Sequence, residues 1–286
     1  MKLYQLGLYE KSMPALLSLP EKLRETGNAG LDYLELSVDE SDEKLSRLEW
    51  GKGEIGPLKN AVTETGIPIK SICLSAHRLF PLGDPDPDVR RKSLDIMGKA
   101  LVLASRLGIG IIQIAGYDVY YKDSTEETVR YFAENLEKSV RLAACEGIIL
   151  AFETMETPFI DTVEKAAYWA GKFPSPYLQI YPDSGNITNA ALKYGGSVKD
   201  DLEKGKGRIA ALHLKESKPG VYRDVPYGEG HVDFMEAVNT AWNMGVRLYV
   251  GEFWFRNGDC SLRTTLRENC VFLRKFLDSQ CNREGS

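Results

Sequence analysis

The chain has 286 residues, of which 43% are hydrophobic and 27% are charged, and its formal net charge is −5. This length allows one large α/β barrel or two smaller domains, and the composition is typical of a globular protein. The negative charge argues against nucleic acid as the main partner, because phosphate backbones are bound by basic surfaces. Uninterrupted apolar runs stay short of the ~18 residues that a membrane span needs, so we expect no membrane partner.

Cysteine usage and the first residues bear on the cellular location. The five cysteines form no CxxC pair and their number is odd, a pattern typical of reduced thiols in a cytoplasmic protein. The N-terminal sequence passes straight into a strand-like pattern and lacks the long apolar stretch of a signal peptide. We therefore expect a cytoplasmic location.

Short apolar runs of strand type alternate with amphipathic helical stretches along the chain. The clearest helices are expected at 88–108, which follows Pro87, and at 124–147, which opens with the capping sequence STEE; both end at a glycine. The runs expected to form strands cover residues 3–10, 31–38, 69–76, 109–116, 148–154, 177–183, 209–215 and 248–254.

A strand followed by a helix, eight times over, predicts parallel strands joined by right-handed crossovers. Eight such units close into an α/β fold of the (β/α)8 or TIM barrel type, with about 250 residues. The alternative, a doubly wound open sheet, would usually carry a glycine-rich loop after its first strand, where this chain reads GLYEKSMP. We predict one barrel domain over residues 1–286, with residues 281–286 as a frayed tail.

Four polar residues stand alone at the ends of four successive apolar runs: Glu153, Asp183, His213 and Glu252. In a barrel the C-terminal ends of the strands meet at one face, so the four side chains should lie together. A single carboxylate there is more often a helix cap, but four on consecutive strands are hard to explain as caps. A cation satisfies several buried carboxylates at once. We therefore predict one divalent metal ion, and the three carboxylates and one imidazole suit Zn²⁺, Mn²⁺ or Co²⁺.

This set of four resembles the site of the xylose-isomerase-like barrel superfamily of sugar isomerases and epimerases. Longer motifs are similar to the L-ribulose-5-phosphate 3-epimerase family, also called L-xylulose-5-phosphate 3-epimerases or hexulose-phosphate isomerases. The resemblance covers essentially the whole chain. It implies that the four residues bind the metal, that Glu153 and Glu252 are the catalytic acid/base pair, and that the protein forms a homodimer. The motifs lie at 34–50, 71–86, 113–121, 181–186 and 213–234.

The implied reaction interconverts L-xylulose 5-phosphate and L-ribulose 5-phosphate, in L-ascorbate or pentose breakdown. Removal of the C3 proton gives an enediolate that a cation stabilises, and inversion needs a base and a proton donor on opposite faces. An aldose–ketose or hexulose-phosphate isomerase, a free-ketose 3-epimerase and a dehydratase would use similar machinery. Three histidines and a negative charge disfavour an apurinic endonuclease. A non-catalytic sugar-binding protein would not need both glutamates.

Polar residues near the same strand ends are candidates for contacts with the sugar phosphate. Arginine binds phosphate through a bidentate fork and lysine as a point charge, although most basic residues are simply solvated. Arg47 and Arg78 are further candidates for phosphate contacts at this end. Superfamily epimerases of free ketoses typically carry a histidine where this chain has Asn186, a difference that fits a phosphorylated substrate. The candidates are His77, Glu156, Asn186, Lys215, Lys218 and Arg223.

Overall fold

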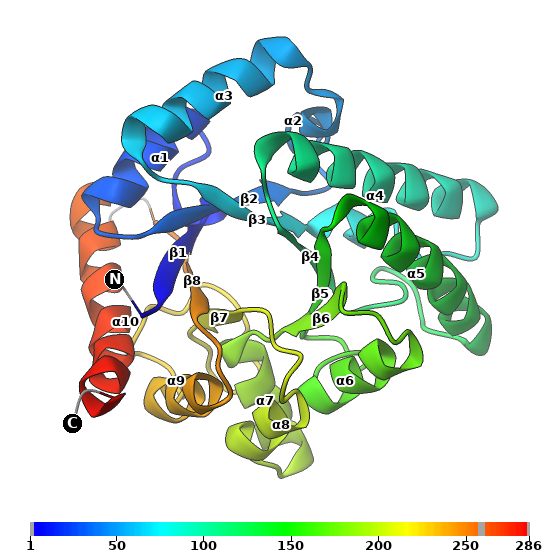
Figure 1. The fold of residues 1–286 in the computed structure, drawn as a ribbon. Helices are drawn as coiled ribbons and strands as arrows, with labels where there is room; N and C mark the ends of the chain where they lie inside the picture. Colours follow the sequence, from blue (N-terminus) through cyan, green and yellow to red (C-terminus); the bar gives the residue numbers. More distant parts are fainter. Residues whose placement is uncertain (1–2, 257–260, 285–286) are drawn as a thin grey trace.

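The computed structural model describes residues 3–256 and 261–284, and their eight strands form one parallel sheet (Figure 1). Each predicted run contains one strand, so the predicted (β/α)8 fold is confirmed. The strands are β1 (Gln5–Tyr9), β2 (Tyr33–Val38), β3 (Ile69–Leu74), β4 (Ile111–Ala115), β5 (Ile149–Glu153), β6 (Leu178–Tyr181), β7 (Leu212–Lys215) and β8 (Leu248–Glu252).

Helices surround the sheet on its outer side (Figure 1). In α5 the Thr125 hydroxyl accepts a hydrogen bond from the Thr128 backbone N–H, so the predicted capping sequence does begin this helix. The α-helices are α1 (Leu19–Asn28), α2 (Asp42–Leu45), α3 (Lys52–Thr65), α4 (Pro87–Leu107), α5 (Glu126–Glu146), α6 (Val163–Lys172), α7 (Ser184–Tyr194), α8 (Val198–Lys204), α9 (Phe234–Asn243) and α10 (Leu262–Glu284). Short 3₁₀ turns are η1 (Glu10–Ser12), η2 (Ser46–Glu49) and η3 (Ser75–Arg78).

The C-terminal helix extends into the segment expected to be a frayed tail. Because α10 continues to Glu284, it includes residues 281–284. Residues 285–286 lie outside the described part of the chain.

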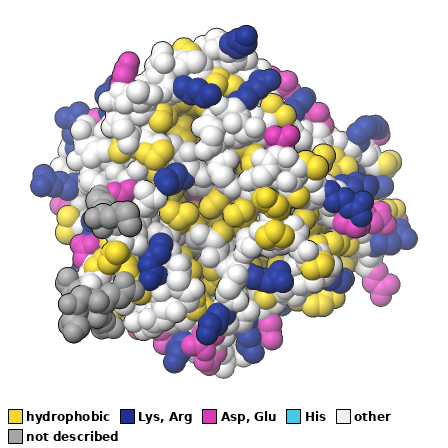
Figure 2. Space-filling model, viewed as in Figure 1, with side chains coloured by type: hydrophobic (Ala, Val, Ile, Leu, Met, Phe, Trp, Pro, Cys, Tyr) yellow, Lys and Arg dark blue, Asp and Glu magenta, His cyan; other side chains and the backbone are white. Residues whose placement is uncertain are grey.

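Among the described helices, none combines the length and the apolar character that crossing a membrane requires. Figure 2 shows the molecule from the same side as Figure 1, with charged side chains of both signs spread around the rim of that face.

The barrel closes between β6 and β7, which are joined by two isolated parallel bridges rather than by a continuous ladder. The bridges pair Ile180 with Ile209 and Asp183 with His213. The His213 backbone N–H donates to the Pro182 carbonyl at 2.9 Å. Closure of the barrel therefore sets two of the predicted metal ligands side by side.

The barrel interior below the site holds aromatic side chains. The hydroxyl of Tyr33 donates to the Tyr249 carbonyl at 2.9 Å, so this ring crosses the interior from β2 to β8. A Cβ at Gly7 would lie 2.4 Å from the Tyr33 ring, which explains why β1 carries glycine there. The Tyr33 ring therefore fills the barrel interior between β1 and β8.

A buried ion-pair cluster ties the ends of β1 and β2 to the helices that follow them. The Glu10 carboxylate is fully buried. It forms ion pairs with Lys22 Nζ at 3.2 Å, Lys44 Nζ at 2.5 Å and Arg47 Nη1 at 2.5 Å. Burial raises the pKa of Glu10, but the Arg47 guanidinium and the two ammonium groups outweigh it and hold this pKa well below its usual range. The Arg47 guanidinium is therefore buried in an ion pair with Glu10, and the expectation that it binds phosphate is not supported.

We predict that Glu10→Gln lowers the free energy of unfolding by about 3–5 kcal/mol, because three buried cations lose their anion. Since the folded-state pKa is depressed, the stabilisation is complete above the unfolded pKa of ~4.3 and is lost as pH falls toward the folded value. Urea unfolding should show the largest difference from the wild type near pH 7 and a smaller one below pH ~4.

Glu43→Gln is the matched control, because the Glu43 carboxylate is exposed and lies 3.6 Å from the same Lys44 ammonium. Exposed pairs contribute about 0–1 kcal/mol. Equal losses of stability in the two variants would contradict a special role for Glu10.

Candidate metal and substrate site

The four predicted metal ligands meet at the C-terminal ends of β5 to β8. Glu153 and Glu252 are the last residues of β5 and β8, His213 lies in β7, and Asp183 caps the N-terminus of α7 just after β6. One ligand atom from each residue lies within 4.8 Å of the others, and all four residues are buried. The structure therefore brings together the residues that the sequence placed at one end of the barrel.

The imidazole of His213 lies at the centre of the group. Its Nδ1 is 2.8 Å from Glu252 Oε2, 3.6 Å from Glu153 Oε1 and 3.8 Å from Asp183 Oδ2. Burial alone lowers the pKa of His213, but the carboxylates of Glu35, Glu153 and Glu252 outweigh it and raise this pKa well above its usual value. Nδ1 is the ring nitrogen that faces the three acidic candidate ligands.

The environment of Asp183 fits a cation. Its Oδ1 accepts a hydrogen bond from the Asn186 backbone N–H at 2.7 Å. Oδ2 is buried and accepts no hydrogen bond from the described residues, although Lys215 Nζ lies 3.1 Å away. Burial raises the pKa of Asp183 to about 7, and the nearby Glu252 and Glu153 add to the shift while Lys215 opposes it. The donor set of three carboxylates and one imidazole could hold one divalent metal ion.

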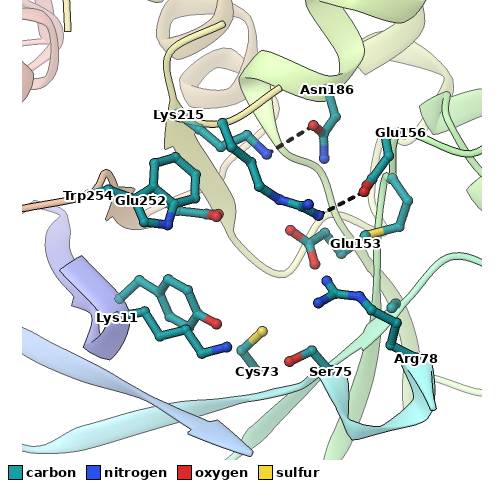
Figure 3. A pocket seen from close by; sticks show the side chains of 14 residues that line it. Lys11, Cys73, Ser75, Arg78, Glu153, Glu156, Asn186, Lys215, Glu252 and Trp254 are labelled. Carbon is teal, nitrogen blue, oxygen red and sulfur yellow. Dashed lines mark hydrogen bonds and ion pairs between the residues drawn. The ribbon is translucent and has the colours of Figure 1, made fainter. Parts of the chain in front are cut away.

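Of the four candidate ligands, Glu153 and Glu252 line a cavity of about 240 Å³ (Figure 3). Cations and hydroxyl groups line the parts of the wall beyond the metal ligands. The lining residues are Tyr9, Lys11, Cys73, Ser75, Arg78, Ala115, Glu153, Met155, Glu156, Asn186, Lys215, Arg223, Glu252 and Trp254.

Asn186 lines the cavity, but its amide is already bonded at both ends. Nδ2 donates to the Thr154 carbonyl at 2.7 Å, and Oδ1 accepts from Lys215 Nζ at 2.9 Å (Figure 3). Asn186 thus supports Lys215 at the cavity wall, and its own contact with a substrate stays a prediction. The buried Lys215 ammonium lies between Asn186 and Asp183, beside the candidate metal ligands.

Glu156 and Arg223 also reach the cavity and bind each other there. Arg223 Nη2 donates to Glu156 Oε1 at 2.7 Å, and the Tyr120 hydroxyl donates to the same oxygen at 2.7 Å. Burial raises the pKa of Glu156, but Arg223 and the Tyr120 hydrogen bond outweigh it and lower this pKa. The Glu156 carboxylate thus holds Arg223, from the loop after β7, over the cavity.

Two predicted substrate contacts are not placed at the cavity. His77 lies in η3, is 4% exposed, and donates from Nε2 to the Ser93 carbonyl at 3.1 Å, so its ring faces α4. Burial lowers the pKa of His77 to about 4. The Lys218 side chain is 47% exposed and lies 3.9 Å from Glu229. Neither residue lines the cavity, so the structure does not support these two expectations.

Sequence reasoning missed some of the polar residues on the opposite wall. Lys11 follows β1, where it pairs with Asp39 at 2.5 Å, and Ser75 follows β3. Arg78, which the sequence already offered as a candidate phosphate contact, extends over the Tyr120 ring at 4.9 Å. The Arg78 Nε and the Ser75 Oγ are buried and have no hydrogen-bond partner among the described residues. Their position after the first and third strands was the only sequence signal.

The family model described as xylose isomerase-like TIM barrel matches residues 23–276. L-ribulose-5-phosphate 3-epimerase UlaE from Shigella boydii serotype 18 is 44% identical over 250 residues, which cover 87% of this chain and 87% of that protein. UlaE from Escherichia coli (strain SE11) has the same identity and the same coverage.

Solved structures show the same fold at low sequence identity. The D-psicose 3-epimerase of Clostridium cellulolyticum H10, with D-tagatose, has a TM-score of 0.79 at 17% identity and covers 96% of this chain and 99% of its own. An L-ribulose 3-epimerase has a TM-score of 0.76 at 16% identity, with 99% and 97% covered. The family model and the UlaE relatives at 44% identity show that the chain belongs to the xylose isomerase-like TIM barrel family, within its L-ribulose-5-phosphate 3-epimerase group, and is an epimerase of the isomerase class.

Proposed function

We propose that this protein is a metal-dependent epimerase that interconverts L-xylulose 5-phosphate and L-ribulose 5-phosphate. The observation that carries the proposal is the buried group of Glu153, Asp183, His213 and Glu252 at the floor of a cavity with cationic walls. The name of the relatives at 44% identity supports the choice of substrate. One divalent ion, Zn²⁺, Mn²⁺ or Co²⁺, would be held by these four residues.

The two glutamates are the proposed acid/base pair. Their carboxylates enter the cavity from β5 and β8 (Figure 3). One carboxylate accepts the C3 proton, and the other donates a proton to the opposite face of C3; the two exchange roles in the reverse direction. A cation bound by the four residues would supply Lewis-acid stabilisation of the charge that develops on the enediolate. The Lys215 ammonium adds positive charge beside Asp183.

The cations on the far walls are the proposed phosphate contacts. Arg78 and Ser75 present buried polar atoms that lack hydrogen-bond partners among the described residues, and Lys11 lies on the same wall. Arg223 reaches the cavity from the loop after β7. Arginine and hydroxyl donors suit a phosphate dianion, since bonds to charged groups are about twice as strong as neutral ones. This places the proposed phosphate contacts partly on residues that the sequence did not single out.

We also propose, on the resemblance alone, a single-domain homodimer in the cytoplasm that acts in L-ascorbate or pentose breakdown.

Proton NMR of L-xylulose 5-phosphate in D₂O tests the reaction itself. Formation of L-ribulose 5-phosphate with deuterium at C3 is expected. Label at C1 or C2 would instead indicate an aldose–ketose isomerase, and loss of water would indicate a dehydratase. A 3-epimerase that prefers free ketoses or hexulose phosphates would exchange C3 in those sugars instead.

Glu153→Gln and Glu252→Gln should each lower kcat by at least ~10²-fold, because each removes one partner of the proton transfer. Rates in D₂O are compared at equal metal content, measured on the same samples, since both residues are also proposed ligands. Glu229→Gln is the control, because Glu229 is exposed in the loop after β7. Wild-type exchange at C3 by either cavity variant, with metal bound, would remove that glutamate from the mechanism.

Arg78→Ala should reduce kcat/KM for L-xylulose 5-phosphate by about 10- to 100-fold, the loss expected for a hydrogen bond to a charged group. The same variant should leave the much slower turnover of free L-xylulose unchanged. Lys218→Ala, on the exposed loop, should alter neither substrate. Equal losses on the phosphorylated and the free sugar would show that Arg78 does not contact the phosphate.

Removal of divalent ions with a chelator should abolish activity, and Zn²⁺, Mn²⁺ or Co²⁺ should restore it. Because a ligand that binds only the folded state stabilises it by RT ln(1 + [L]/Kd), metal at 100 times its Kd should add about 2.7 kcal/mol and raise Tm. Thermal unfolding with and without the ion measures this. Full activity after removal of all bound metal would contradict metal dependence.

A further inference from the structure

Glu35 is a buried carboxylate that neither the sequence analysis nor the proposed mechanism uses. It lies inside the barrel in β2 and is 0% exposed. In the sheet it pairs with Tyr9 of β1 and Ser71 of β3. Burying a carboxylate costs several kcal/mol unless hydrogen bonds or opposite charges compensate. Its partners therefore indicate why an acidic residue is there.

The two oxygens of Glu35 have different partners. Oε2 accepts hydrogen bonds from the Ser71 hydroxyl at 2.6 Å and from the Tyr181 hydroxyl at 3.0 Å. Oε1 lies 2.7 Å from His213 Nε2. Since an ionised carboxylate only accepts, His213 Nε2 must carry the hydrogen of this bond. The two hydroxyl groups hold the carboxylate in place, and the carboxylate in turn holds the imidazole.

The opposite ring nitrogen is the one that faces the acidic candidate ligands. His213 Nδ1 is 2.8 Å from Glu252 Oε2, on the far side of the ring from Glu35. The Gln113 amide nitrogen lies 3.4 Å from Nδ1 and 3.3 Å from Nε2, so it does not distinguish the two nitrogens. The Tyr181 ring packs edge-on against the imidazole at 5.0 Å. Without a metal, both ring nitrogens face a carboxylate and each carries a hydrogen; when a cation replaces the hydrogen on Nδ1, the bond to Glu35 keeps the one on Nε2.

We propose that Glu35 is a positioning residue that keeps His213 in the Nε2–H tautomer, with Nδ1 free to bind the metal. A carboxylate bonded to the far nitrogen of a metal-binding histidine fixes the ring and increases its basicity as a ligand. The proposal rests on the proposed metal-dependent function and names a further residue on which that function depends.

The test is zinc affinity, measured by competition with a chromophoric chelator, together with ¹⁵N NMR of histidine-labelled, zinc-loaded protein. The chain has three histidines, so the spectrum contains only three rings. In the wild type, His213 should show zinc at Nδ1 and a proton at Nε2. Glu35→Ala should weaken zinc binding about 10- to 100-fold and disturb the His213 signals.

Two further variants separate positioning from packing. Glu35→Gln keeps an acceptor oxygen for Nε2–H and should recover most of the zinc affinity and the Nε2–H tautomer. Ser71→Ala removes a bond to Oε2 but leaves the Oε1–His213 contact, so its zinc affinity should stay within about twofold of the wild type. If Glu35→Ala does not fold, the zinc affinity and the His213 tautomer of Glu35→Gln still test the proposal.

Several outcomes would overturn the proposal. These are wild-type affinity and tautomer in Glu35→Ala, zinc bound through Nε2 in Glu35→Gln, or a loss in Ser71→Ala as large as in Glu35→Ala. If the wild type binds zinc and only these comparisons fail, the proposed epimerase function stands without the role of Glu35. If the wild type binds none of the three candidate metals, the metal-dependent function fails, and the role of Glu35 fails with it.

Discussion

The crowding of carboxylates at one end of the barrel is the constraint on which the site depends. Ligand atoms of Glu153, Asp183 and Glu252 lie within 4.8 Å of one another in buried surroundings. Like charges this close repel, and burial strengthens the repulsion because the local dielectric is low. Lys215, from β7, supplies part of the compensating positive charge. A divalent cation is the simplest source of the remainder.

Charge is divided between the two halves of the barrel end. Glu153, Asp183 and Glu252 lie on the side of β5 to β8, together with Lys215 and Arg223. The charged residues that line the cavity after β1 and β3 are instead the cations Lys11 and Arg78. A sugar with hydroxyl and carbonyl oxygens at one end and a phosphate at the other would match both halves. This division is consistent with the proposed substrate.

The metal ligands could be predicted from the sequence, but the substrate contacts could be predicted only in part. Each ligand is a lone polar residue at the end of an apolar run, and the (β/α)8 pattern alone sends such residues to one face. Basic residues in loops carry no comparable signal, because most are solvated or paired. Of the basic candidates, Lys215 and Arg223 line the cavity. Lys218 lies outside it, and Arg47 is buried in an ion pair with Glu10.

The sequence by itself determined the eight strands, their parallel order and the polar residues near the C-terminal ends of β5 to β8, because these follow from local periodicity and chain direction. Only the tertiary structure decided which polar groups bind one another. Glu35 and His213 are 178 residues apart in sequence, and they meet because the barrel closes and turns both side chains inward. The partners of a buried charge depend on that closure, and no local pattern in the chain encodes them.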